Sequence, residues 1–77
     1  MVFKGILDYS LEDEDVTYNK LVDVPKLGYS AGWVYRVAKA GNYINNNVYC
    51  EEFDIIMAIA DVGDNQTTIN PNHWTVI

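Results

Sequence analysis

Hydrophobic and polar positions alternate along the chain in short runs, most clearly in the stretch WVYRVAKA that begins at Trp33. In an extended backbone Trp33, Tyr35 and Val37 share one face, and Val34 and Arg36 share the other. The run is rich in β-branched and aromatic residues, which suit the pleated surface of a sheet. It therefore predicts a β-strand.

Four further runs have strand-like patterns, and turn-rich sequence separates them. They are residues 2–9, in which Gly5 is expected to mark a bulge, residues 48–53, the almost continuously apolar residues 54–60, and residues 73–77. The apolar run is typical of a strand that is buried on both faces. Together the runs predict a single all-β domain over residues 1–77, a small open barrel or sandwich of about five antiparallel strands with long polar loops.

The segment between the Trp33 strand and the apolar run has the pattern of a β-hairpin. Gly41 is expected to end the first strand, and the asparagines at residues 45–47 tolerate the positive φ of a tight turn. The chain would then return through VYCEEF. The Asp54 carboxylate is expected to accept hydrogen bonds from backbone amides of this turn and so to fix the entry into the apolar strand.

The predicted structural core combines the inward face of the strands with the residues that shape the turn. Its members are Tyr35, Val37, Gly41, Asp54, Ile56 and Trp74. Trp74 offers the largest apolar surface, and we expect it to cover the face formed by Ile55, Met57 and Ile59.

Net charge narrows the choice of partners. The chain carries a net charge of −6 with only 5 basic residues, whereas nucleic acids and anionic membranes attract basic surfaces. No run of about 18 apolar residues is present, so membrane insertion is not expected either. The acidic run at residues 12–15 is interpreted as a solvated loop rather than a metal site. A calcium loop of Asp61, Asp64 and Asn65 is an alternative, but its spacing fits no EF-hand.

The sequence predicts no catalytic site and no cofactor. Cys50 is the only cysteine and His73 the only histidine, which is too few for a usual zinc site. A Cys50–His73 nucleophile pair would need direct contact between the two side chains. Cys50 shares the face of Val48 in the expected strand, and this favours a buried, inert thiol. We therefore do not expect an enzyme.

The asparagine turn is the candidate binding surface. Exposed aromatic rings stack on sugar faces, and asparagine and tyrosine side chains hydrogen-bond hydroxyl groups. The candidate residues for a glycan or a partner are Tyr43, Asn45, Asn46, Asn47 and Tyr49. The favoured alternative is that the two tyrosines pack across the hairpin. Residues 61–72 form a second long polar loop of the kind on which binding sites occur.

Several motifs in a fixed order suggest a family. Residues KGILD near the start fit K-G-x-x-D, GWVYRV fits G-x-x-Y-x-V, an Ala-Gly pair and the asparagine turn follow, and NHWTVI fits N-x-W-x-x-I. This order resembles a small β module of bacteriophage tail-fibre and other virion appendage proteins, and its rhythm is similar to that of small chitin-binding-type carbohydrate-binding modules. Two positions depart from the module, which has glycine where this chain has Phe53 and a turn glycine where it has Asn47.

The resemblance implies a virion structural protein that is made in the host cytoplasm and acts in the assembly of a fibre, baseplate or head decoration. It also implies attachment to the host surface through glycans. A 77-residue chain that cannot form an internal disulfide gains stability from partner surfaces, which also cover its edge strands. We therefore expect a homo-oligomer, with a trimer favoured, or contact with other virion proteins. The alternatives are an acidic phage-encoded inhibitor that mimics DNA and a small carbohydrate-binding module.

Overall fold

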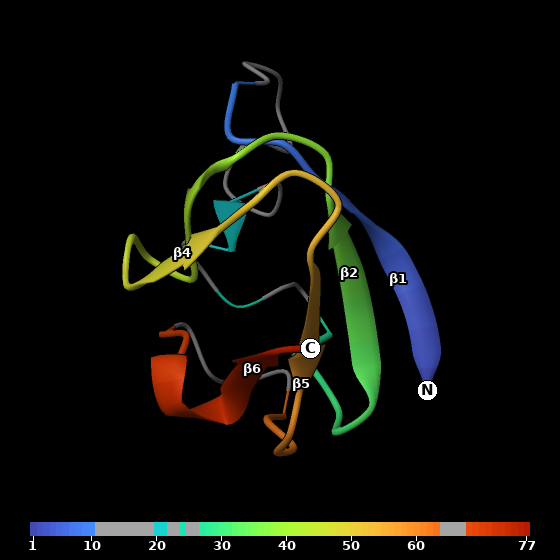
Figure 1. The fold of residues 1–77 in the computed structure, drawn as a ribbon. Helices are drawn as coiled ribbons and strands as arrows, with labels where there is room; N and C mark the ends of the chain where they lie inside the picture. The colour runs from blue at the N-terminus through green and yellow to red at the C-terminus, as the bar shows by residue number, and fades with distance from the viewer. Residues whose placement is uncertain (11–19, 22–23, 25–26, 64–67) are drawn as a thin grey trace.

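The computed structural model describes residues 1–10, 20–21, 24, 27–63 and 68–77, and the fold in these ranges is built from strands, as predicted. One sheet has four strands in the order β1-β2-β5-β6, and a second has the two strands β3 and β4 (Figure 1). The elements are β1 (Val2–Leu7), β2 (Trp33–Val37), β3 (Gly41–Tyr43), β4 (Val48–Cys50), β5 (Ile55–Ala58), the 3-10 helix η1 (Pro71–His73) and β6 (Trp74–Val76).

Strand directions agree with the prediction in three of the four pairings. The pairs β2–β5, β3–β4 and β5–β6 are antiparallel, but β1 and β2 are parallel and lie side by side (Figure 1). The long connection over residues 8–32 allows this, because a parallel pair needs a crossover that returns the chain to the same end of the sheet. The bulge predicted at Gly5 is confirmed, since the β1–β2 register shifts between Phe3 and Gly5.

The predicted hairpin exists, but its first strand is different. β2 ends at Val37 and pairs with β5, while the returning strand β4 pairs with the short β3. Gly41 therefore begins β3 and does not end the Trp33 strand. A Cβ at Gly41 would lie 2.5 Å from the Tyr9 ring, so glycine is needed there for the close approach of that ring. The asparagine turn adopts the predicted positive φ, 54° at Asn45 and 62° at Asn46.

The core lies against one face of the four-stranded sheet. Its buried members include Leu7, Val37, Tyr43, Cys50, Ile56, Ala58 and Trp74, and Tyr35 packs against them from a partly buried position. The prediction that β5 is buried on both faces is wrong, because Ile56 and Ala58 are buried whereas Ile55 is exposed. Trp74 accordingly covers Ala58 and its neighbours, not the predicted face of Ile55, Met57 and Ile59.

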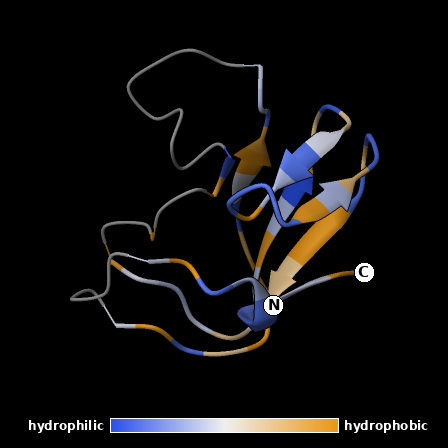
Figure 2. Cartoon of the chain, turned by 90° about the vertical axis from the view of Figure 1, so that its left-hand side faces the viewer, coloured by the Kyte–Doolittle hydropathy of each residue, from blue (hydrophilic) through white to orange (hydrophobic). Residues whose placement is uncertain are grey.

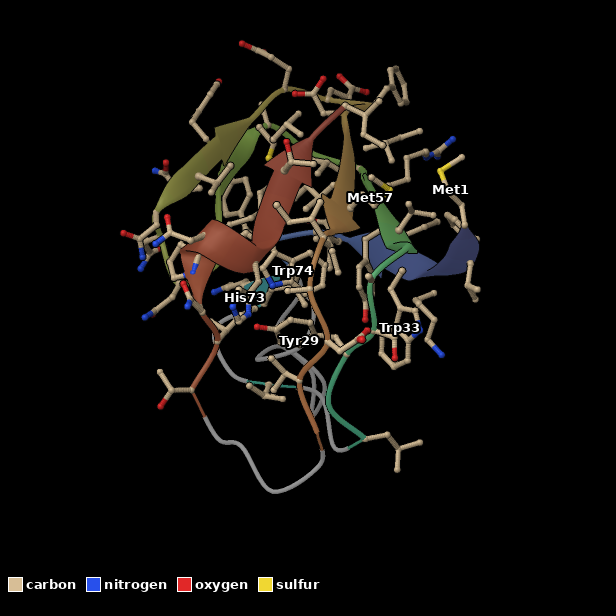
Figure 3. The ribbon with its side chains drawn as sticks, turned by 90° about the horizontal axis from the view of Figure 1, so that it is seen from below. Met1, Tyr29, Trp33, Met57, His73 and Trp74 are labelled. Carbon is tan, nitrogen blue, oxygen red and sulfur yellow. The ribbon has the colours of Figure 1, made fainter. Side chains whose placement is uncertain are left out.

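Trp74 is the centre of an aromatic group. Its ring centroid lies 4.9 Å from that of Tyr29 and 5.9 Å from that of Tyr35. Tyr29, His73 and Trp74 lie together in Figure 3, and Met57 lies away from them on the other side of the strands. The indole Nε1 of Trp74 is buried and has no hydrogen-bond partner among the described residues.

Replacement of Trp74 tests this core. Trp74→Ala should lower the free energy of unfolding by about 3–5 kcal/mol, because it removes a buried aromatic side chain and leaves a cavity. Trp74→Phe is the matched control and should cost less than about 1 kcal/mol, since loss of the unpaired N–H offsets part of the lost contact. Urea unfolding followed by circular dichroism measures both. Equal stability of the wild type and Trp74→Ala would contradict the core assignment.

Candidate functional site

The second face of the four-stranded sheet is the most distinctive surface of the described structure, and we call it the outer face. Side chains of paired residues point to the same side of a sheet, so the pairings assign its members. They are Phe3 and Ile6 on β1, Val34 and Arg36 on β2, Ile55 and Met57 on β5, and Thr75 on β6, with Ile77 continuing the last strand beside Ile55.

The outer face is apolar although much of it is in contact with solvent. Phe3 is 62% exposed and Ile77 is 65% exposed, and Ile6 and Ile55 are also exposed. Arg36 is the only charged residue among the eight members. Figure 2 shows hydrophobic residues spread along the strands of this sheet. Apolar surfaces of this kind are typical of interaction sites, because a monomeric protein gains nothing by exposing them, so the outer face is the candidate site.

The β1 edge, one of the two edges of the sheet, is less suited to pairing than the outer face. β1 lies at this edge and carries both a bulge and Lys4, two features that discourage addition of another strand. The Lys4 ammonium lies 4.0 Å from the centroid of the Trp33 ring, a cation–π contact that holds the charge at the edge. An apolar partner would therefore contact the face of the sheet.

Phe53 extends the outer face from a bulge that lies just before β5, opposite the end of β2. The Phe53 amide donates to the Val37 carbonyl at 2.8 Å, and the Val37 amide donates to the Asp54 carbonyl at 2.7 Å, so two residues oppose one. The Asp54 amide donates to the Glu51 carbonyl, and the Asp54 carboxylate accepts from the Glu51 amide at 2.8 Å. Asp54 thus accepts a backbone amide just before β5, as predicted, but the amide belongs to the turn at residues 51–54 and not to the asparagine turn. Phe53 has a φ of 73°, in a position of the bulge and turn that glycine usually occupies.

A positive φ costs a residue with a side chain about 1–2 kcal/mol. Leu21 and Ile44 share this conformation, but both are completely buried and so gain from packing. Phe53 is 64% exposed, and its ring contacts the Arg36 guanidinium at 5.5 Å from the ring centroid. Such a contact contributes about 0.5–1 kcal/mol at an exposed site, which does not offset the backbone cost.

The predicted binding turn is only partly accessible. Tyr43 is buried, and its hydroxyl donates to the Lys39 carbonyl at 2.6 Å, so its ring cannot stack on a sugar. Tyr43 is therefore a core residue, but its ring meets that of Tyr9 at 6.4 Å between centroids and not Tyr49, which is exposed, so the two tyrosines do not pack together across the hairpin. The Asn47 side-chain amide donates to the carbonyls of Ile44 and Asn45 and thereby closes the turn.

Asn45 and Asn46 remain in solvent, and Asn46 borders a cavity of about 310 Å³ together with Tyr9, Lys20, Gly41 and Asn42. Tyr9, not Tyr43 or Tyr49, is the aromatic residue of this cavity. Sequence reasoning missed Tyr9 because its approach to Gly41 joins residues that are distant in the chain.

A larger pocket of about 570 Å³ is bordered by Tyr29, Asp61, Val62, Ile69, Asn70 and His73, among others. The Tyr29 hydroxyl and His73 Nδ1 are 2.8 Å apart, and Asn70 Nδ2 is 3.4 Å from His73 Nε2. Asn70 Oδ1 accepts the Asn72 amide, so Asn70 presents its N–H₂ group to His73. Neutral His73 then accepts at Nε2 and donates from Nδ1 to the Tyr29 oxygen, which leaves the tyrosine hydrogen free for another acceptor.

The structure separates the two candidate nucleophile residues. His73 bonds Tyr29 and Asn70, whereas the Cys50 sulfur is buried and lies 4.0 Å from the Val48 carbonyl oxygen. Burial, with a smaller contribution from the Asp54 charge, raises the pKa of Cys50 to about 11. A thiol with this pKa is a poor nucleophile at neutral pH.

Two sequence interpretations concern residues that the structure does not fully describe. The acidic run at residues 12–15 lies outside the described residues, as do Asp64 and Asn65 of the alternative calcium loop. Within the described ranges, no group of three or more His, Cys, Asp or Glu residues is arranged to hold a metal ion. The same part of the chain includes no helix with the length and apolarity to cross a membrane.

Comparison of the chain with models of protein families, with curated proteins and with solved structures gave no match. The site is therefore argued from its geometry.

Cys50 should resist modification in the folded protein. We expect Ellman's reagent at pH 8 to label it far more slowly than the unfolded chain, because the thiol is buried and protonated. The thiol is protonated in both states at neutral pH, and as the pH rises through 9 towards about 11 it ionises first in the unfolded chain. The free energy of unfolding should therefore fall by roughly 1–2 kcal/mol over this range.

Cys50→Ala is the control for that pH dependence, because it removes the thiol and leaves the titrating tyrosines in place. Its unfolding free energy should fall less steeply above pH 9. Rapid labelling of the folded wild type at pH 8 would contradict the burial of the thiol.

Proposed function

We propose that the protein is a bacteriophage virion structural subunit that works in assembly, by packing its outer face against the outer face of a second copy. The apolar outer face is the observation that carries this proposal, since Phe3, Ile6, Ile55 and Ile77 gain burial only from a partner. The virion setting rests on the order of motifs that resembles phage appendage modules.

Charge distribution supports a second copy as the partner. The chain has a net charge of −6, yet none of the eight members of the outer face has a carboxylate side chain. Two acidic copies can therefore meet there without opposing their negative charges. A stable interface buries about 800 Å² on each partner, roughly a sixth of the 4704 Å² accessible surface of this chain.

One apolar face also limits the symmetry of the assembly. When the same patch on two copies packs together, the two are related by a twofold axis and the assembly closes as a dimer. The outer face thus favours a dimer as the basic unit, in place of the trimer expected from the sequence.

The assembly proposal predicts that one charged side chain in the outer face abolishes association. Ile55→Lys places an ammonium group on the central strand β5 and should give a folded monomer. Light scattering at increasing concentration should report two chains for the wild type and one for the variant. Tyr49→Lys is the matched control, because Tyr49 is also an exposed strand residue but belongs to the other sheet, and it should still form dimers.

A one-chain mass for the wild type at millimolar concentration would refute self-association. The virion assignment has a separate test, mass spectrometry of purified particles, in which absence of the chain would count against it.

The Tyr29–His73 pocket supports attachment to host-surface glycans as a second function. The pocket offers a free tyrosine hydrogen, the amide of Asn70 and the carboxylate of Asp61, beside the apolar residues Val62 and Ile69. Sugars present hydroxyl groups that donate and accept on the same ring, and this mixture of groups matches them.

Glycan arrays test this second function. Asp61→Asn keeps an oxygen that can accept the Ala31 amide at Oδ1, as in the wild type, but removes the negative charge. It should weaken sugar binding about tenfold, because hydrogen bonds to a charged acceptor are the stronger ones. Tyr49→Ala serves as the control for the asparagine turn and should bind as the wild type does. A blank array with the wild type would remove the glycan function.

A further inference from the structure

Phe53 combines an unfavourable backbone conformation with a ring that its own chain leaves largely in solvent. Its φ of 73° is imposed by hydrogen bonds on both sides, from the Phe53 amide to Val37 and from the Val37 amide to Asp54. The turn that ends at Asp54 adds a further bond to Glu51. Because these bonds fix the backbone whatever the side chain, glycine would serve the fold better at this position.

The ring must therefore have a use other than stability of the single chain. Residues held in strained conformations persist where the strain serves a site, and an exposed aromatic ring is the side chain that most often dominates binding between proteins. The contact of the ring with Arg36 places it beside the outer face, because Arg36 pairs with Ile6 and Ile55 across the sheet.

We propose that Phe53 is the anchor of the contact between two copies, its ring inserting against the outer face of the second copy. The inference rests on the proposed self-association and adds the side chain that carries most of its affinity. The bulge then has a binding role, since it fixes the ring at the margin of the face with little loss of side-chain freedom on association.

Charge complementarity identifies a second copy as the occupant. Arg36 lies within the outer face, and the exposed Glu51 and Glu52 immediately precede Phe53. A twofold axis that passes close to this margin of the face can bring Arg36 of each copy towards the acidic pair of the other. The outer face and its margin therefore carry charges of both signs beside apolar residues, so the surface can be complementary to a second copy of itself.

Three substitutions separate the ring from the backbone. Phe53→Gly removes the ring and the strain, Phe53→Ala removes the ring and keeps the strain, and Phe53→Tyr keeps both. The dimer dissociation constant, measured by analytical ultracentrifugation, should rise at least tenfold for the glycine and alanine variants and less than about threefold for tyrosine. In dilute solution, where the chains are separate, the unfolding equilibrium constant of Phe53→Gly should be about fivefold smaller than that of Phe53→Ala.

Each contrary result has a distinct meaning. A wild type that dimerises with a Phe53→Ala variant of equal affinity would overturn the anchor and leave the proposed function standing. A Phe53→Gly variant no more stable than Phe53→Ala would overturn the assignment of strain on which the inference depends. A wild type that stays monomeric would overturn the proposed self-association and the anchor together.

Discussion

The four-stranded sheet is packed on one side only, and the other features of the described structure depend on this. The described residues supply one layer of core, in which Ile56, Ala58 and Trp74 meet the inward side of the hairpin. A domain of this size buries a small share of its surface, and its conformational entropy nearly balances what it gains. The apolar residues that remain on the outer face therefore represent unused stabilisation, which a partner surface can supply.

Local chemistry was predictable where a turn or strand depends on its own residues. The alternation that begins at Trp33 identified β2, the asparagines identified the turn after Tyr43, and Asp54 accepts a backbone amide as expected, although from Glu51 in the next turn. Gly5 marks a bulge for the same reason, since glycine tolerates a conformation that other residues avoid. In each case the signal and its cause lie within a few residues of one another.

Pairing between distant segments was not predictable from the pattern. The sequence pattern predicted a hairpin between the strands now labelled β2 and β4. In the structure β2 pairs with β5, and β4 pairs with the short strand β3 that precedes the turn. The parallel alignment of β1 depends on the path of the long connection, which carries no periodic signal. Likewise, the apolar run at Ile55 predicted burial on both faces, because hydrophobicity alone cannot tell a side chain buried within one chain from one available to a partner.

The expected sandwich and the observed open sheet are compatible at the level of the assembly. Two sheets that pack through their apolar faces lie about 10 Å apart, with their side chains interleaved, and this is the arrangement of a β-sandwich. Two copies joined through their outer faces would form such a pair, with Ile6 and Ile55 of each copy in a shared layer. Phe53 sits at the margin of that layer, where Val37 and Asp54 hold its backbone by hydrogen bonds. The apolar excess of this short chain is thus explained if the second layer of its core is provided by another molecule.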